Sequence, residues 1–478
     1  GVALLGGLMG PVSQTHIEFY GDLSLTAATT STIYAGQHGG DRFRLFGDGT
    51  NYVAGGLSGT GDLDLDGGRG LYYVWGDNSA YSGTVTLAAG NGALFPQHAN
   101  ALGTGTVIVR DGGGTYRGMG LMANIGATVV VDPGGVLDSM GGLPVTTPIV
   151  MNGGTINAGG LYDKMPYGDS IFAGPITLQA DGIFRVGFSY PLRLSGTISE
   201  SGGARRVIIP AAGSYGSDYY RVHFSGTGLW TGGTLIEPGG VAWAETDNAM
   251  GTGTIDVQGR LIVGDSSGMP VIEVNGGALE LRGTLEADVV FNSGVIQNTL
   301  GSLYGFSNGT LTGEVTMNGD VSLRTSGDTG RWLRLTGTLN DGANSYKILV
   351  DSGNGSTYLE GVGLYDGGTD VTQGRLLVDN KDALGTGSVY VGRNLGTANN
   401  QGGGSLVTRV DGCLDGLPSV IIDAGARFEV NSDETTLATI NRAITWFEAR
   451  TEGIYLELLI LTASTLLPIP IPVIPLRQ

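Results

Sequence analysis

Histidine and cysteine are the side chains of this sequence that could support metal or nucleophilic chemistry. The four histidines, His16, His38, His98 and His223, lie far apart and share no motif. Because zinc motifs place two histidines a few residues apart, this spacing argues against a zinc centre. The single cysteine, Cys413, can form neither an intramolecular disulfide nor a thiolate metal cage, so we expect a buried apolar residue.

One run of carboxylates has a spacing that suits a hard cation. Asp62, Asp64 and Asp66 are followed by two glycines, as in a fragment of a calcium loop. Their alternation with Leu63 and Leu65 instead places the acids on one solvated face of a strand, and we favour this interpretation. The glycine-rich calcium nonapeptide does not recur in the sequence.

Hydrolysis of polysaccharides would require two carboxylates about 5–10 Å apart. In a stacked fold such a pair comes from adjacent coils, which are distant in sequence, and no carboxylate signature repeats here. Scattered aromatic residues, such as Tyr72, Tyr73 and Tyr81, either pack on a sheet or stack on sugar rings. We therefore predict no catalytic residues, no cofactor and no bound metal.

Short strands would have to position all of these side chains. Runs such as Thr128–Asp132 and Val271–Asn275 are β-branched and bounded by Gly, Asn or Asp. Helical periodicity is nearly absent over the first 430 residues. The 88 glycines lie between apolar runs, as turn residues do, and the hydrophobic content of 41% is too high for a disordered chain.

The sequence repeats itself three times at a period of roughly 140 residues. Three signatures recur in the same order, and they begin at Leu57, Leu194 and Leu335, at Asn100, Asn248 and Asp382, and at Val131, Val274 and Ile422. A long repeat with variable interior spacing favours a solenoid, in which each coil contacts only its neighbours. We expect coils of about 4.8 Å each, stacked into one rod.

Three segments of the middle copy resemble the autotransporter-associated β-strand repeat: Leu194–Gly203, Trp230–Gly240 and Asn248–Val257. The outer copies match through Tyr81–Thr84 and Asn100–Val107, and through Asp366–Thr369 and Asp382–Val389. The resemblance covers residues from about 56 to 431 and implies a right-handed parallel β-helix exposed outside a bacterial cell. Autotransporters end in a membrane β-barrel, which this sequence does not contain. The barrel was either cleaved off or never present, and we favour an exported protein that carries the repeat without it.

The expected organisation is all-β, with five segments. They are an N-terminal segment with the first coils at 1–55, repeats at 56–192, 193–333 and 334–440, and an apolar cap with a proline-rich tail at 441–478. In the cap, Leu437, Ile440, Ile444 and Phe447 have helical spacing, whereas Ala443–Trp446 also fits a strand. A short helix and a final strand are equally compatible with these residues.

The composition excludes some partners. The chain has 25 basic and 44 acidic residues, a net charge of −19, and no basic cluster, so we predict no nucleic-acid binding. The apolar stretch Ile454–Leu467 contains Glu457 and is followed by prolines at 468, 470, 472 and 475. Because a membrane helix needs about 20 continuous apolar residues, we predict no membrane span and an extended tail.

Both ends of the sequence are apolar. The first ten residues carry no charge, and from Ile454 onward only Glu457 and Arg477 are charged. Solenoids normally cover their ends with polar caps, so apolar ends indicate contacts, and a head-to-tail contact gives an open polymer. The alternative is that both ends fold back on their own rod. The candidate assembly residues are Val2, Leu4, Leu5, Leu8, Met9, Ile454, Leu456, Leu458, Leu459, Ile460, Pro468, Ile469, Pro470, Ile471, Pro472, Val473, Ile474 and Pro475.

These patterns lead to one expectation about function. We expect a non-catalytic, extracellular structural protein of a bacterial surface, which assembles with itself and has surface glycans as a further possible partner. A polysaccharide-active enzyme and an adhesive autotransporter-type passenger are the alternatives.

Overall fold

The computed structural model describes the chain from residue 56 to 430 with short gaps, together with isolated strands before and after this range. The gaps are 66–70, 88–92, 111–117, 122–123, 140–141, 143, 159–167, 188–189, 212–219, 299–307, 326–329, 393–402 and 424. Outside this range the described residues are 2–4, 8–9, 17–19, 23–25, 29–33, 42–45 and 444–446.

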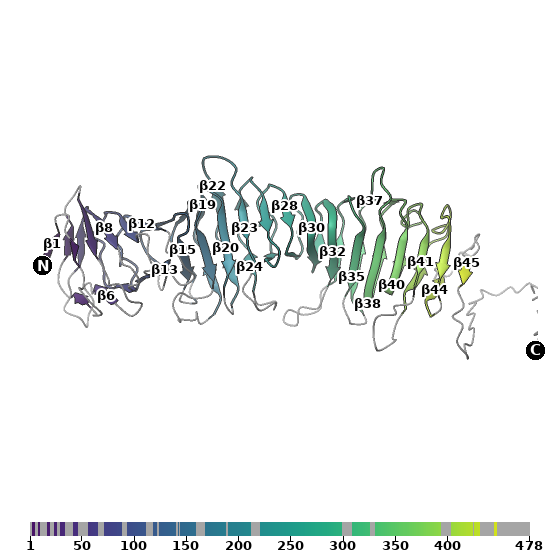
Figure 1. Ribbon diagram of the computed structural model, residues 1–478, viewed down its shortest axis with the longest axis horizontal. Coiled ribbons are helices and arrows are strands. Elements are labelled where there is room, and N and C mark those ends of the chain that lie inside the picture. Colours follow the sequence, from purple (N-terminus) through teal and green to yellow (C-terminus); the bar gives the residue numbers. More distant parts are fainter. Residues whose placement is uncertain are drawn as a thin grey trace, which may run out of the picture.

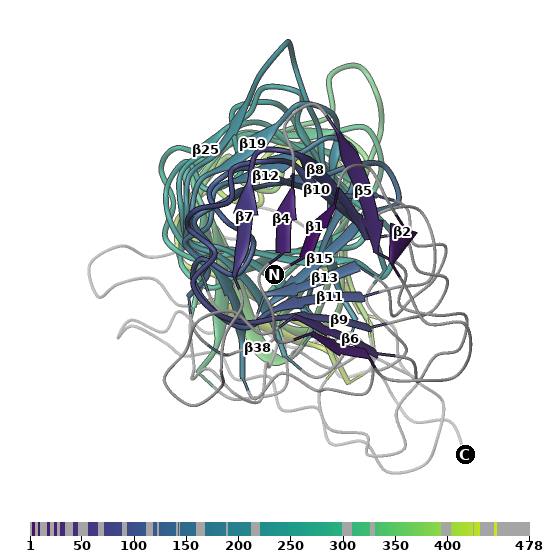
Figure 2. The ribbon, with the colours of Figure 1, turned by 90° about the vertical axis from the view of Figure 1, so that its left-hand side faces the viewer.

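The described chain is all-β and forms an elongated stack of parallel strands (Figure 1). In β12 (Thr106–Val109), Val107 lies beside Val85 of β10 (Val85–Leu87) on one side and beside Val129 of β14 (Thr128–Val131) on the other. Viewed along the long axis, successive coils surround one interior (Figure 2). This arrangement confirms the parallel β-solenoid expected from the sequence.

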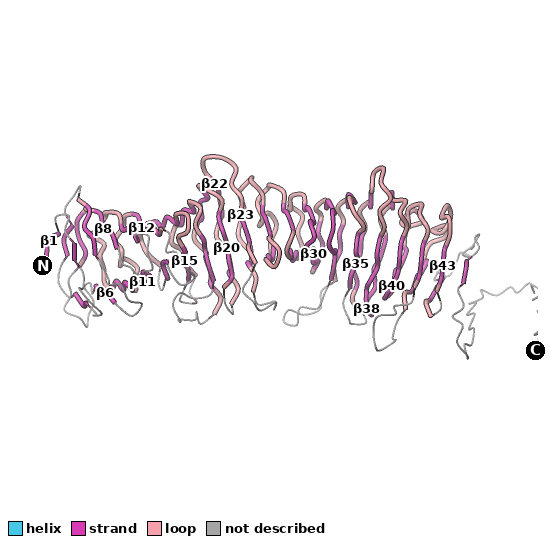
Figure 3. The backbone as a smooth tube through the Cα atoms, viewed as in Figure 1, coloured by secondary structure: helices cyan, strands magenta, loops and turns pink. Residues whose placement is uncertain are grey.

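Strands and the loops between them make up the described residues (Figure 3). No helix in this part of the chain is long and apolar enough to cross a membrane.

The core consists of aliphatic side chains stacked in rows along the rod. Leu63, Val85, Val107, Val129 and Ile149 occupy one row on successive coils, and each is at most 3% exposed. Parallel pairing in register repeats the same inward position from coil to coil, so β-branched residues stack on one another. Burying each such side chain contributes roughly 1.5–3 kcal/mol.

Alternation along single strands follows the sequence pattern. In β8 (Asp62–Leu65) Leu63 and Leu65 are buried, while Asp62 is exposed and Asp64 half-buried. The predicted solvated acidic face therefore holds for these residues, and Asp66 lies outside the described part of the chain.

Carboxylates at the coil corners connect neighbouring coils. An aspartate at or just before the start of a strand accepts the backbone N–H of the corresponding residue one coil later. The pairs are Asp62 with Thr84, Asp181 with Arg206, Asp265 with Thr284, Asp288 with Glu314 and Asp320 with Lys347, at 2.8–3.0 Å. Because a backbone N–H needs an acceptor where the sheet ends, these aspartates serve the fold.

A second connection is a row of side-chain amides. Asn275 Nδ2 donates to Asp256 Oδ1 at 2.7 Å, Asn292 Nδ2 to Asn275 Oδ1 at 2.6 Å, and Asn318 Nδ2 to Asn292 Oδ1 at 2.9 Å. Each amide donates toward the preceding coil, and the carboxylate of Asp256 receives the first of these bonds. All three amides therefore donate in the same direction along the rod.

The three sequence repeats share one packing unit. Tyr81, Trp230 and Tyr365 occupy the same motif position, and each is at most 1% exposed. Their carbonyl oxygens accept the backbone N–H groups of Thr104, Thr252 and Thr386, respectively, at 2.9–3.0 Å. The repeat signature therefore encodes an aromatic anchor in the core and the backbone turn that covers it.

A glycine with positive φ completes each unit. Gly103, Gly251 and Gly385 have φ of 72°, 73° and 62°. A Cβ atom on Gly251 would lie 2.6 Å from the carbonyl oxygen of Trp230 and 2.7 Å from its indole ring. Only glycine combines this conformation with such a close approach.

The two ends are partly described. β45 (Ile444–Trp446) pairs in parallel with β43 (Val420–Ile422), so a strand, not a helix, forms at these residues. Val2 and Leu4 lie in β1 (Val2–Leu4), and Leu8 and Met9 form β2. Of the other residues assigned to the cap and to assembly, Leu437, Ile440, Phe447, Leu5 and those from Ile454 to Pro475 lie outside the described part.

Substitution of Gly251 by alanine tests the packing unit. We expect G251A to lower the free energy of unfolding by about 1–2 kcal/mol for the positive φ and by a further 1–3 kcal/mol for displacing Trp230. Gly342 is the matched control, because its φ is 65° and nothing lies within 4 Å of the added Cβ. Guanidinium unfolding of both variants measures the difference, and equal midpoints would contradict the role of Trp230.

Candidate functional site

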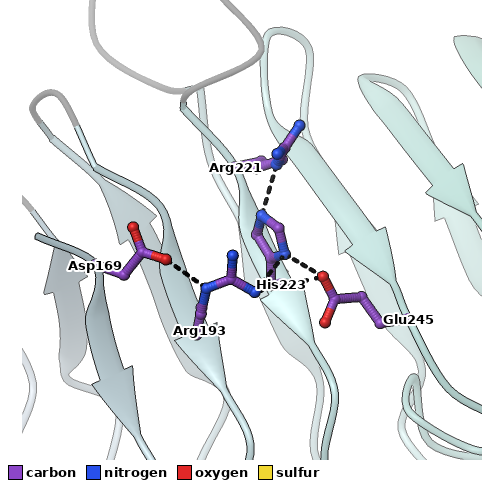
Figure 4. A network of polar contacts seen from close by, with 5 residues as sticks. All are labelled: Asp169, Arg193, Arg221, His223 and Glu245. Carbon is purple, nitrogen blue, oxygen red and sulfur yellow. Dashed lines mark hydrogen bonds and ion pairs between the residues drawn. The ribbon is translucent and has the colours of Figure 1, made fainter. Parts of the chain in front are cut away.

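A histidine and four charged residues meet on the outward side of one sheet. Arg193 in β21 (Leu192–Leu194) lies beside His223 in β24 (Val222–Phe224), and His223 lies beside Trp243 in β27 (Val241–Ala244). Because Leu194 and Phe224 point into the core, strand alternation directs the residue before each of them away from it. Figure 4 shows the resulting group.

Both ring nitrogens of His223 are hydrogen-bonded (Figure 4). Nδ1 lies 2.6 Å from Glu245 Oε1, and Nε2 accepts from Arg221 Nε at 2.5 Å. Since Nε2 is an acceptor, the proton sits on Nδ1 and is donated to Glu245. His223 and Arg221 are 0% and 1% exposed, so these two side chains are buried although they point away from the core.

Further charges extend the network to neighbouring coils. Arg193 Nε donates to Asp169 Oδ2 at 2.5 Å, and Arg193 Nη1 lies 3.5 Å from Glu245 Oε1. The guanidinium of Arg221 lies 4.5 Å from the centre of the Trp243 ring, and that of Arg282 lies 5.3 Å from it. Arg–aromatic contacts of this kind stabilise a partly desolvated cation.

The charge states follow from burial and pairing. Burial lowers the pKa of His223, and the hydrogen bond to Glu245 only partly opposes this effect. The hydrogen bond from His223 lowers the pKa of Glu245, which is therefore ionised at neutral pH. A neutral histidine beside an ionised glutamate is the arrangement implied by the hydrogen-bond geometry.

This pair resembles the base of a hydrolytic triad but lacks its free nitrogen. A general base must present one ring nitrogen to the nucleophile and the other to the carboxylate. Here Arg221 donates to the nitrogen that would accept the proton. The geometry therefore supports a bond between coils and not proton abstraction.

A second charged cluster crosses four coils nearer the C-terminal end. Arg334 lies in β36 (Trp332–Leu335), whereas Glu360, Asp379 and Arg409 directly follow β38 (Ile348–Leu359), β40 (Thr369–Val378) and β42 (Ser405–Thr408). Arg334 Nη1 lies 3.1 Å from Glu360 Oε1, and Arg409 Nη1 donates to Asp379 Oδ2 at 2.9 Å. Leu359 and Val378 pair in register, so Glu360 and Asp379, which follow them, are neighbours on adjacent coils.

Both carboxyls of this cluster are paired with arginines. Inverting and retaining enzymes hold their two carboxyls about 5–9.5 Å apart, to leave room for water or the sugar. Here Glu360 is paired with Arg334 and Asp379 with Arg409, so each carboxyl has a charged partner. The neighbouring rings of Trp332 and Tyr358 hold the Arg334 guanidinium, 4.8 and 4.9 Å from the ring centres, respectively.

The structure places the other candidate residues in ordinary roles. The Nδ1 of His98 accepts the N–H of Asn100 at 3.2 Å, and His16 and His38 lie outside the described part. Cys413 is buried as expected, and burial raises its pKa to about 11. Within the described residues, no group of three or more His, Cys, Asp or Glu side chains could hold a metal ion.

Aromatic residues named in the sequence are mostly packed. Tyr72 and Tyr81 are fully buried in the core. Tyr73 stacks between Trp75 and Phe95, with ring centres 5.6 and 5.1 Å away, respectively. These three rings belong to a small cluster outside the main core, so they pack on one another.

The two charged clusters were not predicted from the sequence. His223 and Glu245 are 22 residues apart, and Arg193 and Glu245 are 52 apart. A usable signal was the charged residue that directly follows an apolar strand, as at Glu360 and Asp379. Aligning those strand ends would have placed the two carboxyls in one row.

Comparison with known proteins identifies no relative. No protein-family model matches the chain, and neither the curated proteins nor the solved structures give a match. The class of protein defined by the structure is thus a long all-parallel β-solenoid, and its resemblance to the autotransporter-associated repeat rests on the sequence motifs.

Replacement of Glu245 by glutamine tests the histidine network. We expect E245Q to lose about 1.5–3 kcal/mol of stability at neutral pH, because Arg193 and the His223 N–H lose a charged acceptor. Since folding lowers the pKa of Glu245, this contribution is present above the unfolded pKa and lost as the pH falls through the folded one. Wild type and E245Q should therefore converge in acid.

The control for E245Q is E237Q, because Glu237 has no side-chain hydrogen bond within the described part of the chain. Urea unfolding at a series of pH values measures both variants. An E245Q curve that runs parallel to wild type at all pH values would contradict the assigned charge states.

Proposed function

We propose that this protein is a non-catalytic structural β-solenoid of a bacterial surface, serving as a rigid rod. The carrying observation is that the large side chains common to all three repeats are buried. Tyr81, Trp230 and Tyr365 fill the core, and each is covered by a glycine turn from a later segment. The shared threonines Thr104, Thr252 and Thr386 are exposed, but they are small turn residues and form no catalytic constellation.

The charges of the protein support the same proposal. Corner aspartates accept backbone N–H groups of the next coil, and the two charged clusters join neighbouring coils. The net charge of −19 then reflects how the coils are held together and not an electropositive partner. The extracellular, bacterial location rests on the resemblance to the autotransporter-associated repeat.

We extend this proposal to end-to-end assembly of the rods. Among the described strands, β1 pairs only with β4 (Leu23–Leu25), and β45 pairs only with β43. Unpaired strand edges are templates for another strand. The apolar segments 1–9 and 454–475 would cover such a contact between two copies, and the contact would repeat along a filament.

Removal of residues 454–478 tests the assembly. We expect the full chain to form filaments and the truncated chain to remain as single rods, because the apolar tail is lost. Negative-stain electron microscopy and analytical ultracentrifugation measure both. Identical filaments from the truncated chain, or a monomeric full chain at high concentration, would show that the ends do not drive assembly.

Incubation with polysaccharides tests the proposed lack of catalysis. We expect no release of reducing ends from acidic or neutral polysaccharides, since the carboxyls of both charged clusters are paired with arginines or with His223. The variant E360Q removes one carboxyl of the Glu360–Asp379 pair. Release by wild type that disappears in E360Q would establish the alternative, a polysaccharide-active enzyme. Retention of a glycan without cleavage would favour the adhesive passenger.

A further inference from the structure

Four charged residues form a continuous row across consecutive coils, in the order Arg334, Glu360, Asp379, Arg409. The two outer members are cations and the two inner members are carboxyls. The spacing is fixed by the backbone, because Glu360 N–H donates to the Leu335 carbonyl at 2.9 Å. Likewise Asp379 N–H donates to Leu359 and Arg409 N–H to Val378, each at 3.0 Å. The backbones that carry the two carboxyls therefore stay at the spacing of adjacent coils unless the stack opens.

Two ionised carboxylates have only acceptor atoms, so a hydrogen bond between them requires one proton. Glu360 and Asp379 follow Leu359 and Val378, which pair in register on adjacent coils, so the two carboxyls can form such a bond when one of them is protonated. Asp379 Oδ1 is buried and has no hydrogen-bond partner within the described part of the chain, whereas Asp379 Oδ2 accepts from Arg409. The oxygen left over on Asp379 is the acceptor that a protonated Glu360 would satisfy.

We propose that Glu360 and Asp379 form a single-proton site that ties two neighbouring coils together as the pH falls. The protonated Glu360 donates to Asp379, while Arg334 contacts both carboxyl oxygens of Glu360 and Arg409 contacts Asp379 Oδ2. When the proton leaves, the contact becomes a repulsion between two carboxylates, balanced only by the two arginines. The consequence is a rod whose coils bind more tightly at this place in mild acid than in alkali.

The surrounding groups shift the pKa of Glu360 in opposite directions. Burial raises the pKa of Glu360 above its ordinary value, and the charge and hydrogen bond of Asp379 raise it further. Arg334 from the preceding coil and Arg409 from the second following coil lower it, and the net shift is upward. A carboxyl whose folded pKa is raised stabilises the fold fully below the unfolded pKa. That stability is lost as the pH rises through the folded pKa.

The direction in which stability changes with pH distinguishes Glu360 from other carboxylates of the rod. The pKa values of Glu245 and Asp247 are lowered by hydrogen bonds from His223 and from the Ser267 N–H, respectively, so their contributions are lost toward acid. Glu360 contributes the opposite slope. A measurement that isolates the coils around Glu360 can therefore distinguish its effect from the rest of the molecule.

The test is hydrogen exchange of the full chain in wild type, E360Q and D379N between about pH 5 and pH 8. Peptides that cover residues 356–364 and 376–384 report on the coils joined by the site. After correction for intrinsic exchange, we expect protection of these wild-type peptides to fall as the pH rises. Each pKa unit of upward shift corresponds to about a tenfold change in the opening equilibrium.

Either substitution removes the repulsion between two carboxylates, so both variants should show pH-independent protection in the same peptides. E429Q is the matched control. Glu429 pairs with Arg375 at 3.4 Å on the same sheet, without a second carboxyl in that contact, and E429Q should keep the wild-type pH dependence. Wild-type protection that does not change with pH, or that changes equally in E360Q and D379N, would overturn the proposal.

Discussion

The whole structure depends on parallel backbone hydrogen bonding between coils. Each coil supplies the acceptors and donors that the next one needs, at a fixed spacing of about 4.8 Å. A side chain therefore has close neighbours at the same position one coil before and one coil after, as for Val85, Val107 and Val129. Core rows, corner carboxylates and amide rows are consequences of this single constraint.

Because of the same constraint, outward charges destabilise the fold unless they alternate in sign along the rod. Like charges on neighbouring coils would face each other at sheet distance, which is destabilising. Arg193 lies between Asp169 and Glu245, and Glu280 binds both Arg260 and Arg282. Adjacent carboxyls at Glu360 and Asp379 break this alternation, and two arginines enclose them.

Strand alternation and the repeat were the features that could be predicted from the sequence. The pattern of Asp62–Leu65 determines which side chains are buried because a strand has period two. The repeat signature indicated a packing unit, since its glycines and aromatic residues have few other uses in a sheet. These local rules were sufficient to predict the fold class.

The charged clusters depended on information that local rules do not contain. Partners on neighbouring coils are 17 residues apart for Asn275 and Asn292 but 33 apart for Tyr390 and Asp423, because the loops between strands differ in length. A shift of one residue in any loop would change which side chains face each other. The sequence therefore did not pair His223 with Glu245, which is 22 residues away and lies within hydrogen-bonding distance.

The row of amides determines how readily this rod is damaged by deamidation over time. Asn275 and Asn318 are each followed by glycine, and a glycine offers no side chain to hinder cyclisation of the asparagine amide onto the backbone. Deamidation of Asn275 would replace the amide donor with a carboxylate facing Asp256, so a hydrogen bond would become a repulsion. The hydrogen bonds along the row restrain these amides and so oppose cyclisation. A coil that opens repeatedly loses this restraint and would deamidate before its neighbours.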